Sequence, residues 1–173
     1  ITIAAGASSG SVSIAAPTDD VYVDGSTISR QIASASGGNF ENLAVNTASV
    51  TTSITDTADT TTVSLTATPS VAEGGSIVYT ASLTAPAQSA VTVTLDNGTV
   101  ITIAAGSSSG SVSITAPADD VYVDGSTISR QIASASGGNF ENLAVNTASA
   151  TTSITDTVDT TTVSLTATPS VAE

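Results

Sequence analysis

The chain has 173 residues, of which 40% are hydrophobic and 3% aromatic, and it contains neither cysteine nor histidine. Its 15 acidic residues and two arginines give a formal net charge of -13, which disfavours nucleic acid as a partner and favours divalent cations. Without cysteine no disulfide can brace the fold, and no apolar run approaches the roughly 20 residues that membrane insertion requires. The abundant Ala, Val, Ile, Leu, Ser and Thr are typical of an extracellular all-β protein.

The sequence repeats itself with a period of 100 residues. Residues 1–73 and 101–173 differ at five positions only. A strand-like run begins at Thr60, and this sets the phase of the repeat. On that phase we expect three parts. Residues 1–59 would be the C-terminal part of one β-sandwich repeat, residues 60–159 a complete repeat, and residues 160–173 the first strand of the next repeat. The chain then reads as a window of a longer tandem array.

Apolar and polar residues alternate with period two through the complete repeat, which is the pattern of half-buried strands. Turn signals separate the runs, and no helical periodicity competes with them. About seven short strands in each repeat predict an all-β fold, namely tandem immunoglobulin-like β-sandwich repeats of 100 residues. In chain order, the strands are expected at residues 62–67, 77–83 and 91–95, around Ile101 and Val112, and at residues 127–135 and 147–155.

The strongest local signal is Asp96-Asn97-Gly98, between the runs around Val93 and Ile101. Asn-Gly readily supplies the two positive φ angles of a type I′ turn. We therefore expect a tight hairpin with positive φ at both Asn97 and Gly98.

An up-and-down count of the strands places seven of the eight acids of the complete repeat at one end of the sandwich. The eighth, Glu141, falls at the other end together with Asn139. Head-to-tail stacking would bring these two residues against acids of the preceding copy, across the linker at Asp59. The acids concerned are Asp19, Asp20, Asp24 and Asp56. Oxygen ligands without histidine or cysteine suit Ca²⁺.

Acidic residues in loops are usually solvated turn formers, and for Asp96 alone this interpretation is favoured. A crowded group of carboxylates is different, because its members repel one another unless a cation pairs with them. A metal is therefore the simpler interpretation for the acidic loop together with its two neighbours, that is for Asp119, Asp120, Asp124, Glu73 and Asp156.

Several segments together resemble a known family. They are VAEGGSIVYT, LDNG, GSSSGSVS, DDVYVDG, SGGNFENL and SITDT. The combination resembles the bacterial immunoglobulin-like extender repeats of giant RTX or large adhesion proteins, which are exported by type I secretion. It is also similar to Calx-β sandwiches, which place an acidic residue after the first strand and a double aspartate in a late loop. The resemblance covers the whole chain.

This resemblance implies a structural extender of a long adhesin or fibre that acts in cell adhesion and biofilms. The protein would be secreted to the bacterial cell surface or extracellular matrix and stiffened by Ca²⁺ at the domain junctions. Its partners would be neighbouring repeats of the same chain and possibly other copies in a fibre. The resemblance carries the calcium role to Glu73, Asp119, Asp120, Asp124, Asp156 and Asp159, and to the matching Asp19, Asp20, Asp24, Asp56 and Asp59.

Other function classes are weighed against the extender. An enzyme is not expected, since the chain has no histidine base, no cysteine nucleophile and no G-x-S-x-G elbow. A calcium-dependent carbohydrate-binding module would share the fold but would normally expose aromatic residues. A self-assembling filament, whose partial sandwiches a neighbouring chain completes by strand addition, ranks second.

Overall fold

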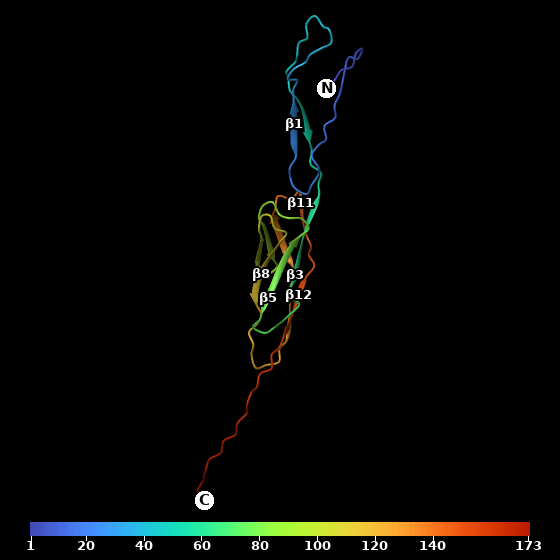
Figure 1. Cartoon of the computed structure of the whole chain (residues 1–173). Coiled ribbons are helices and arrows are strands. Elements are labelled where there is room, and N and C mark those ends of the chain that lie inside the picture. The colour runs from blue at the N-terminus through green and yellow to red at the C-terminus, as the bar shows by residue number, and fades with distance from the viewer. The chain divides into compact units, whose positions relative to one another are not determined.

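The computed structural model describes all of residues 1–173, and its regular elements are strands with no helix (Figure 1). The all-β prediction is thus confirmed. Nothing in the chain meets the length and hydropathy of a membrane-crossing helix. The chain divides into two compact units, Ile1–Asp59 and Thr60–Glu173, called here the first and second units.

The first unit has one regular element, a ribbon of two antiparallel strands. These are β1 (Ser26–Arg30) and β2 (Val50–Ile54), paired from Ser26 with Ile54 to Arg30 with Val50. Most side chains of this unit are exposed, including Phe40 at 66%. A two-stranded ribbon gains little from burial, so this unit has no core of its own.

The second unit contains a four-stranded sheet with the order β11-β3-β5-β8. β3 pairs antiparallel with β5 and parallel with β11, and β5 pairs antiparallel with β8 (Figure 1). This sheet is one layer of the unit. Its strands are β3 (Thr60–Ala67), β5 (Ser76–Leu83), β8 (Ser109–Thr115) and β11 (Asn142–Val145).

The remaining strands of the second unit form two three-stranded sheets, β4-β12-β9 and β10-β6-β7. The strand expected at residues 127–135 is in fact two strands, because β9 and β10 are separated at Gln131 and pair in different sheets. Gln131 leaves the ladder there and its carbonyl accepts a hydrogen bond from the Asp96 N–H. The six strands are β4 (Ser70–Ala72), β6 (Val91–Leu95), β7 (Val100–Ile103), β9 (Ser126–Arg130), β10 (Ile132–Gly137) and β12 (Ala150–Thr155).

The core lies between these layers and is aliphatic except for Tyr79 and Phe140. Alternate residues are buried along β3, β5, β6, β7 and β12, as the period of two predicts. Along β5, for example, Ile77 and Tyr79 have no exposed surface, whereas Val78 between them is 39% exposed. Buried faces on both layers are consistent with a β-sandwich.

The hairpin between β6 and β7 differs from the expected type I′ turn. Gly98 has a φ of 84°, but Asn97 does not have a positive φ. The Gly98 N–H donates to the Leu95 carbonyl at 3.0 Å, and the Leu95 N–H donates to the Thr99 carbonyl at 2.8 Å. The loop therefore holds three residues and ends on a left-handed glycine, which is the next most common hairpin geometry.

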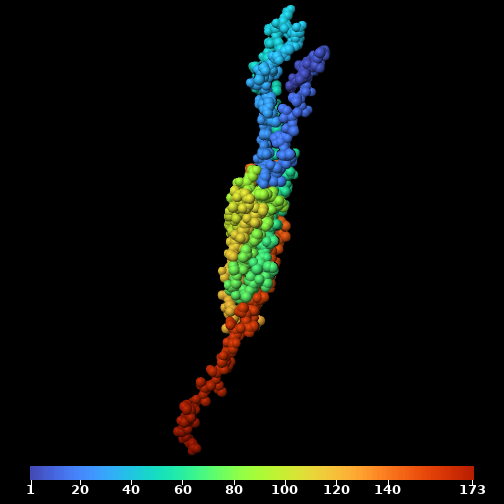
Figure 2. All heavy atoms as spheres, viewed as in Figure 1, coloured from blue at the N-terminus to red at the C-terminus, as the bar shows by residue number.

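The first strand expected within residues 160–173 does not form in this structure. β3 has the same sequence, and it is held between β5 and β11. Residues 160–173 have no strand on either side, and Val163 is 94% exposed. Figure 2 shows this segment in red, extended away from the packed atoms of its own unit.

Truncation of a core side chain in β5 is expected to destabilise the second unit. Ile77→Ala should lower the free energy of unfolding by about 2–5 kcal/mol, because it leaves a cavity between the layers. Val78→Ala, one residue along the same strand but on the outer face, is the matched control and should change it by about 0.5 kcal/mol or less. Urea denaturation of the two variants checks this, and equal losses would contradict the assignment of the core.

Candidate metal centre

Three segments of the second unit meet at the end where β4 and β12 finish. They are the turn after β4, the acidic loop of residues 116–125 and the chain that leaves β12. Backbone hydrogen bonds tie them together: the Glu73 N–H donates to Thr155 at 3.1 Å, and the Gly74 N–H donates to Pro117 at 2.6 Å. Gly74 allows the reversal after β4 through a φ of 68°.

This framework brings the carboxylates of Glu73, Asp124 and Asp156 together. Each offers one oxygen atom, and the three oxygens lie within 4.8 Å of one another. Glu73 is only 8% exposed. Its Oε2 atom and the Oδ1 atom of Asp156 are buried and have no hydrogen-bond partner. Buried carboxylate oxygens without a donor are costly, so this group fits a bound cation.

The electrostatics of the cluster agree with its geometry. The pKa of Glu73 is raised to about 7, first by a hydrogen bond with the Asp124 side chain and then by burial. The charges of Asp124 and Asp156 raise it further, while a hydrogen bond from the Thr157 backbone lowers it. A cation at this point would reverse the effect, because it favours the charged form of each carboxyl.

Two further acids of the predicted set shape the acidic loop instead. Asp120 Oδ1 accepts the Tyr122 N–H at 2.7 Å, which closes a local turn. Asp119 Oδ1 accepts a hydrogen bond from the hydroxyl of Thr157, and this bond joins the loop to the chain that leaves β12. Asp159 lines a small hollow beside Tyr122 and Asp156.

The up-and-down count places Asp96 wrongly. Its Oδ1 atom lies 3.9 Å from Arg130 Nε, and its N–H donates to Gln131, so it sits midway along the path of β9 and β10. The count assumes that every strand spans the full height of the layer. β6 has only five residues and pairs with β10 and β7, so the β6–β7 hairpin ends before the acidic end of the unit.

Asn139 and Glu141 lie at the opposite end of the second unit. The neighbouring Asn142 pairs with Thr60, where β3 begins. Asn139 has a φ of 59°, and its Nδ2 atom donates to Gln88 Oε1 at 2.7 Å. The separation of this end from the acidic end therefore matches the expected arrangement within one repeat.

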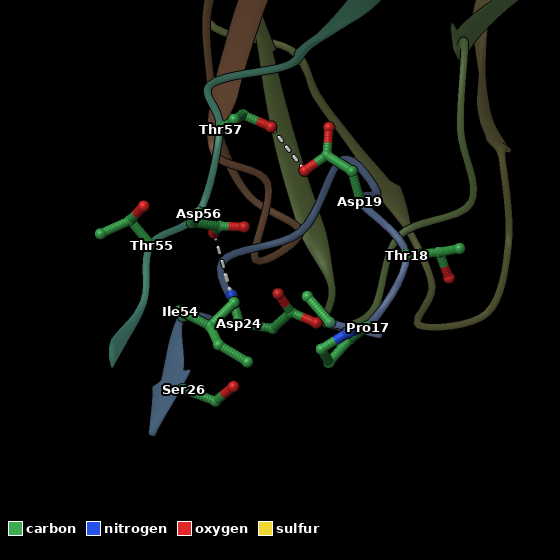
Figure 3. Close-up of a pocket in the computed structure, with 11 residues that line it drawn as sticks. Pro17, Thr18, Asp19, Asp24, Ser26, Ile54, Thr55, Asp56 and Thr57 are labelled. Atoms are coloured by element: carbon green, nitrogen blue, oxygen red, sulfur yellow. Dashed lines mark hydrogen bonds between the residues drawn. The ribbon is translucent and has the colours of Figure 1, made fainter. Parts of the chain in front are cut away.

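The first unit contains counterparts of some of these acids. Asp19, Asp24 and Asp56 line a hollow of about 290 Å³, and Figure 3 shows their side chains approaching from the loop before β1 and from the chain after β2. The Asp24 N–H donates to Asp56 Oδ2 at 3.1 Å, and the Thr57 hydroxyl donates to Asp19 Oδ1 (Figure 3).

Local desolvation raises the pKa of Asp24, and the charges of Asp20, Asp56 and Asp19 add to that effect. Asp20 closes the same local turn as Asp120, accepting the Tyr22 N–H at 2.8 Å. Asp59 is the last residue of the unit. The acids that line the hollow are the three aspartates Asp19, Asp24 and Asp56.

Comparison with known families identifies the chain. A family model described as the LapA domain matches residues 1–57 and 59–157. The chain belongs to the LapA domain family. LapA domains are found in large adhesins, so the chain has an adhesin-related role at the cell surface. The same comparisons found no match among curated proteins or solved structures.

Sequence reasoning did not single out Thr157 or its counterpart Thr57. Both hydroxyls hold the first aspartate of an acidic loop, and the Thr157 backbone also reaches Glu73. The signal was available in the repeated SITDT segment, where a threonine follows the aspartate in both LapA domains. Threonine is common where loops end, so its role here follows from the geometry and not from the residue type.

The raised pKa of Glu73 predicts how the stability of the metal-free protein depends on pH. The folded-state pKa of about 7 lies above the ordinary value of 4.5, so the contribution of Glu73 is fully present below pH 4.5. It is lost as pH rises through about 7. In the presence of a chelator, the melting temperature should therefore fall over this range.

Glu73→Gln is the control, since glutamine does not titrate. Its melting temperature should fall less across the same range, and thermal melts of both proteins in chelator at several pH values measure the difference. Parallel curves would show that Glu73 has no such pKa shift.

Proposed function

We propose that the chain is a structural extender segment of a long bacterial cell-surface adhesin. Tandem immunoglobulin-like repeats of 100 residues would hold the adhesive part away from the cell, and Ca²⁺ would stiffen them at their junctions. Membership of the LapA domain family and the near-identity of residues 1–73 with 101–173 support this proposal. Secretion and a place in biofilms belong to the same proposal.

The observation that carries the calcium proposal is the pair of buried oxygens without partners, Glu73 Oε2 and Asp156 Oδ1. Both belong to a cluster that Asp124 completes. All the ligands are carboxylate oxygens, which favour a hard cation over zinc or copper. Ca²⁺ accepts irregular sets of six to eight oxygens, whereas Mg²⁺ demands near-ideal octahedral geometry, so Ca²⁺ is the better candidate.

The position of the cluster links metal binding to stiffness. Its three carboxylates come from the turn after β4, the acidic loop and the chain that leaves β12. When bound, the metal would neutralise their charges and hold these segments together. The chain that leaves β12 is the one that continues into the next repeat, so its mobility sets the freedom of the junction.

The linker between repeats is short. Four residues separate the end of β12 at Thr155 from Thr160, which matches the first residue of β3. Five Cα steps of this kind span at most about 18 Å. The acidic end of one repeat and the Asn139–Glu141 end of the next are therefore proposed to be close neighbours, with Asn139 and Glu141 as additional oxygen ligands.

One observation favours the self-assembling filament as a second candidate. Residues 160–173 have the sequence of β3 and β4, and Leu165 is 96% exposed. In the second unit the same sequence pairs with β11 and β12 through parallel ladders. If another copy accepts this segment, the mass in sedimentation experiments will rise with protein concentration. An extender that does not self-assemble will keep the mass of one chain.

Calcium should raise the melting temperature of the chain, because it binds the folded arrangement only. The stabilisation by mass action is about 2.7 kcal/mol when free calcium is about a hundred times its dissociation constant. Asp124→Asn removes a ligand and should abolish most of this gain. Asp96→Asn, an acid outside the cluster, should keep it.

Asp24→Asn is the counterpart of Asp124→Asn in the first unit and should have the smaller effect, because no carboxylate of that unit is buried as Glu73 is. Thermal melts with calcium and with a chelator compare the variants. If calcium still raises the melting temperature of Asp124→Asn by the full amount, the proposed metal site is wrong. This outcome does not depend on whether the chain is an extender.

Stiffening is tested by small-angle scattering on a chain extended to two complete repeats. Calcium should increase the maximum dimension, because it removes the repulsion among carboxylates and restrains the linker. An unchanged dimension together with an intact thermal response would refute stiffening while leaving the metal site in place.

A further inference from the structure

The tip of the β6–β7 hairpin carries chemistry that an extender does not use. Of the seven asparagines in the chain, only Asn97 is followed by glycine. Both residues are exposed, and a Cβ atom placed on Gly98 would meet no other atom within 4 Å. Because Gly98 has no side chain, it places no steric obstacle between its backbone nitrogen and the neighbouring carboxamide once the hairpin opens.

We propose that Asn97 is a site of spontaneous deamidation and that the folded hairpin restrains the reaction. The Gly98 nitrogen loses its proton and attacks Cγ of Asn97, and a new N–C bond closes a cyclic succinimide. The Cγ–Nδ2 bond breaks, and Nδ2 leaves as ammonia after taking up a proton. Water then opens the ring at one of its two carbonyls and yields aspartate or isoaspartate. The reaction consumes one water and needs no oxidant or cofactor.

The hydrogen bonds of the closed hairpin oppose the first step. The Gly98 N–H donates to the Leu95 carbonyl at 3.0 Å, so the attacking nitrogen is directed toward β6. Asn97 Oδ1 accepts the Thr99 N–H at 3.1 Å, so the carboxamide is directed toward β7. Both bonds must break before the nitrogen can reach Cγ. The reaction therefore follows local opening of the hairpin, which costs less than global unfolding.

The two products differ in their effect on the hairpin. Aspartate keeps an acceptor oxygen for the Thr99 N–H, so it fits the same turn. Isoaspartate moves a methylene into the backbone and displaces the Gly98 N–H from the Leu95 carbonyl. Either product adds a carboxylate next to Asp96, whose Oδ1 atom lies 3.9 Å from the Arg130 Nε.

The test follows each asparagine of the full chain by peptide mass spectrometry during incubation at mildly alkaline pH, in buffer and in urea. The exchange of an amide NH₂ for OH should appear first at Asn97 in both conditions. It should be at least about tenfold slower in buffer, which corresponds to an opening free energy of about 1.4 kcal/mol. Asn97→Gln should remove this fast signal.

Equal rates in buffer and urea would overturn the restraint, and equally fast change at any other asparagine would overturn the site. A second measurement separates the products. Asn97→Asp should melt at the temperature of the unmodified chain, whereas material enriched in isoaspartate should melt lower. If the isoaspartate form melts at the same temperature, the assigned role of the Gly98 hydrogen bond is wrong.

Discussion

The enforced proximity of Glu73, Asp124 and Asp156 is the constraint on which the acidic end of the second unit depends. Like charges at this distance would separate if they could. They are held because the Glu73 N–H and the Gly74 N–H are bonded to Thr155 and Pro117, in segments that the sheets fix. The fold thus maintains an arrangement that is unfavourable for the bare carboxylates and favourable for a cation.

The two copies of the acidic loop have the same local structure. The acidic loops and the exits of β2 and β12 are almost identical in sequence, and both repeat the same loop hydrogen bonds. In the second unit, Glu73 from the turn after β4 joins Asp124 and Asp156. The cluster of the second unit therefore combines segments from the beginning and from the end of one repeat.

The sequence predicts the strands best where one face is buried and the other exposed. β5 follows its alternation residue by residue, because Ile77 and Tyr79 face the core while Val78 does not. The same reasoning merges β9 and β10, since a period of two cannot reveal that Gln131 leaves the ladder. The turn at Asn97-Gly98 differs from the expected type for a similar reason, because Asn-Gly is compatible with loops of two or three residues.

The sequence predicts which acids belong to the candidate site but not how each of them is arranged. Turn counting places Glu73, Asp124 and Asp156 at one end, as the structure does. The count is wrong for Asp96, because it takes no account of strand length. It also cannot distinguish acids whose carboxylates lie close together from acids that accept hydrogen bonds within a loop. The buried state of Glu73 depends on packing by segments distant in sequence, and only the three-dimensional structure supplies it.

Calcium titration by calorimetry tests the central claim most directly. At a pH above 7 the intact chain should bind Ca²⁺ with a dissociation constant in the range of about 10⁻⁴ to 10⁻³ M that is typical of extracellular modules. Glu73→Gln should lose this binding, and Asp96→Asn should retain it. Absence of binding to the intact chain, or equal binding by Glu73→Gln, would contradict the account.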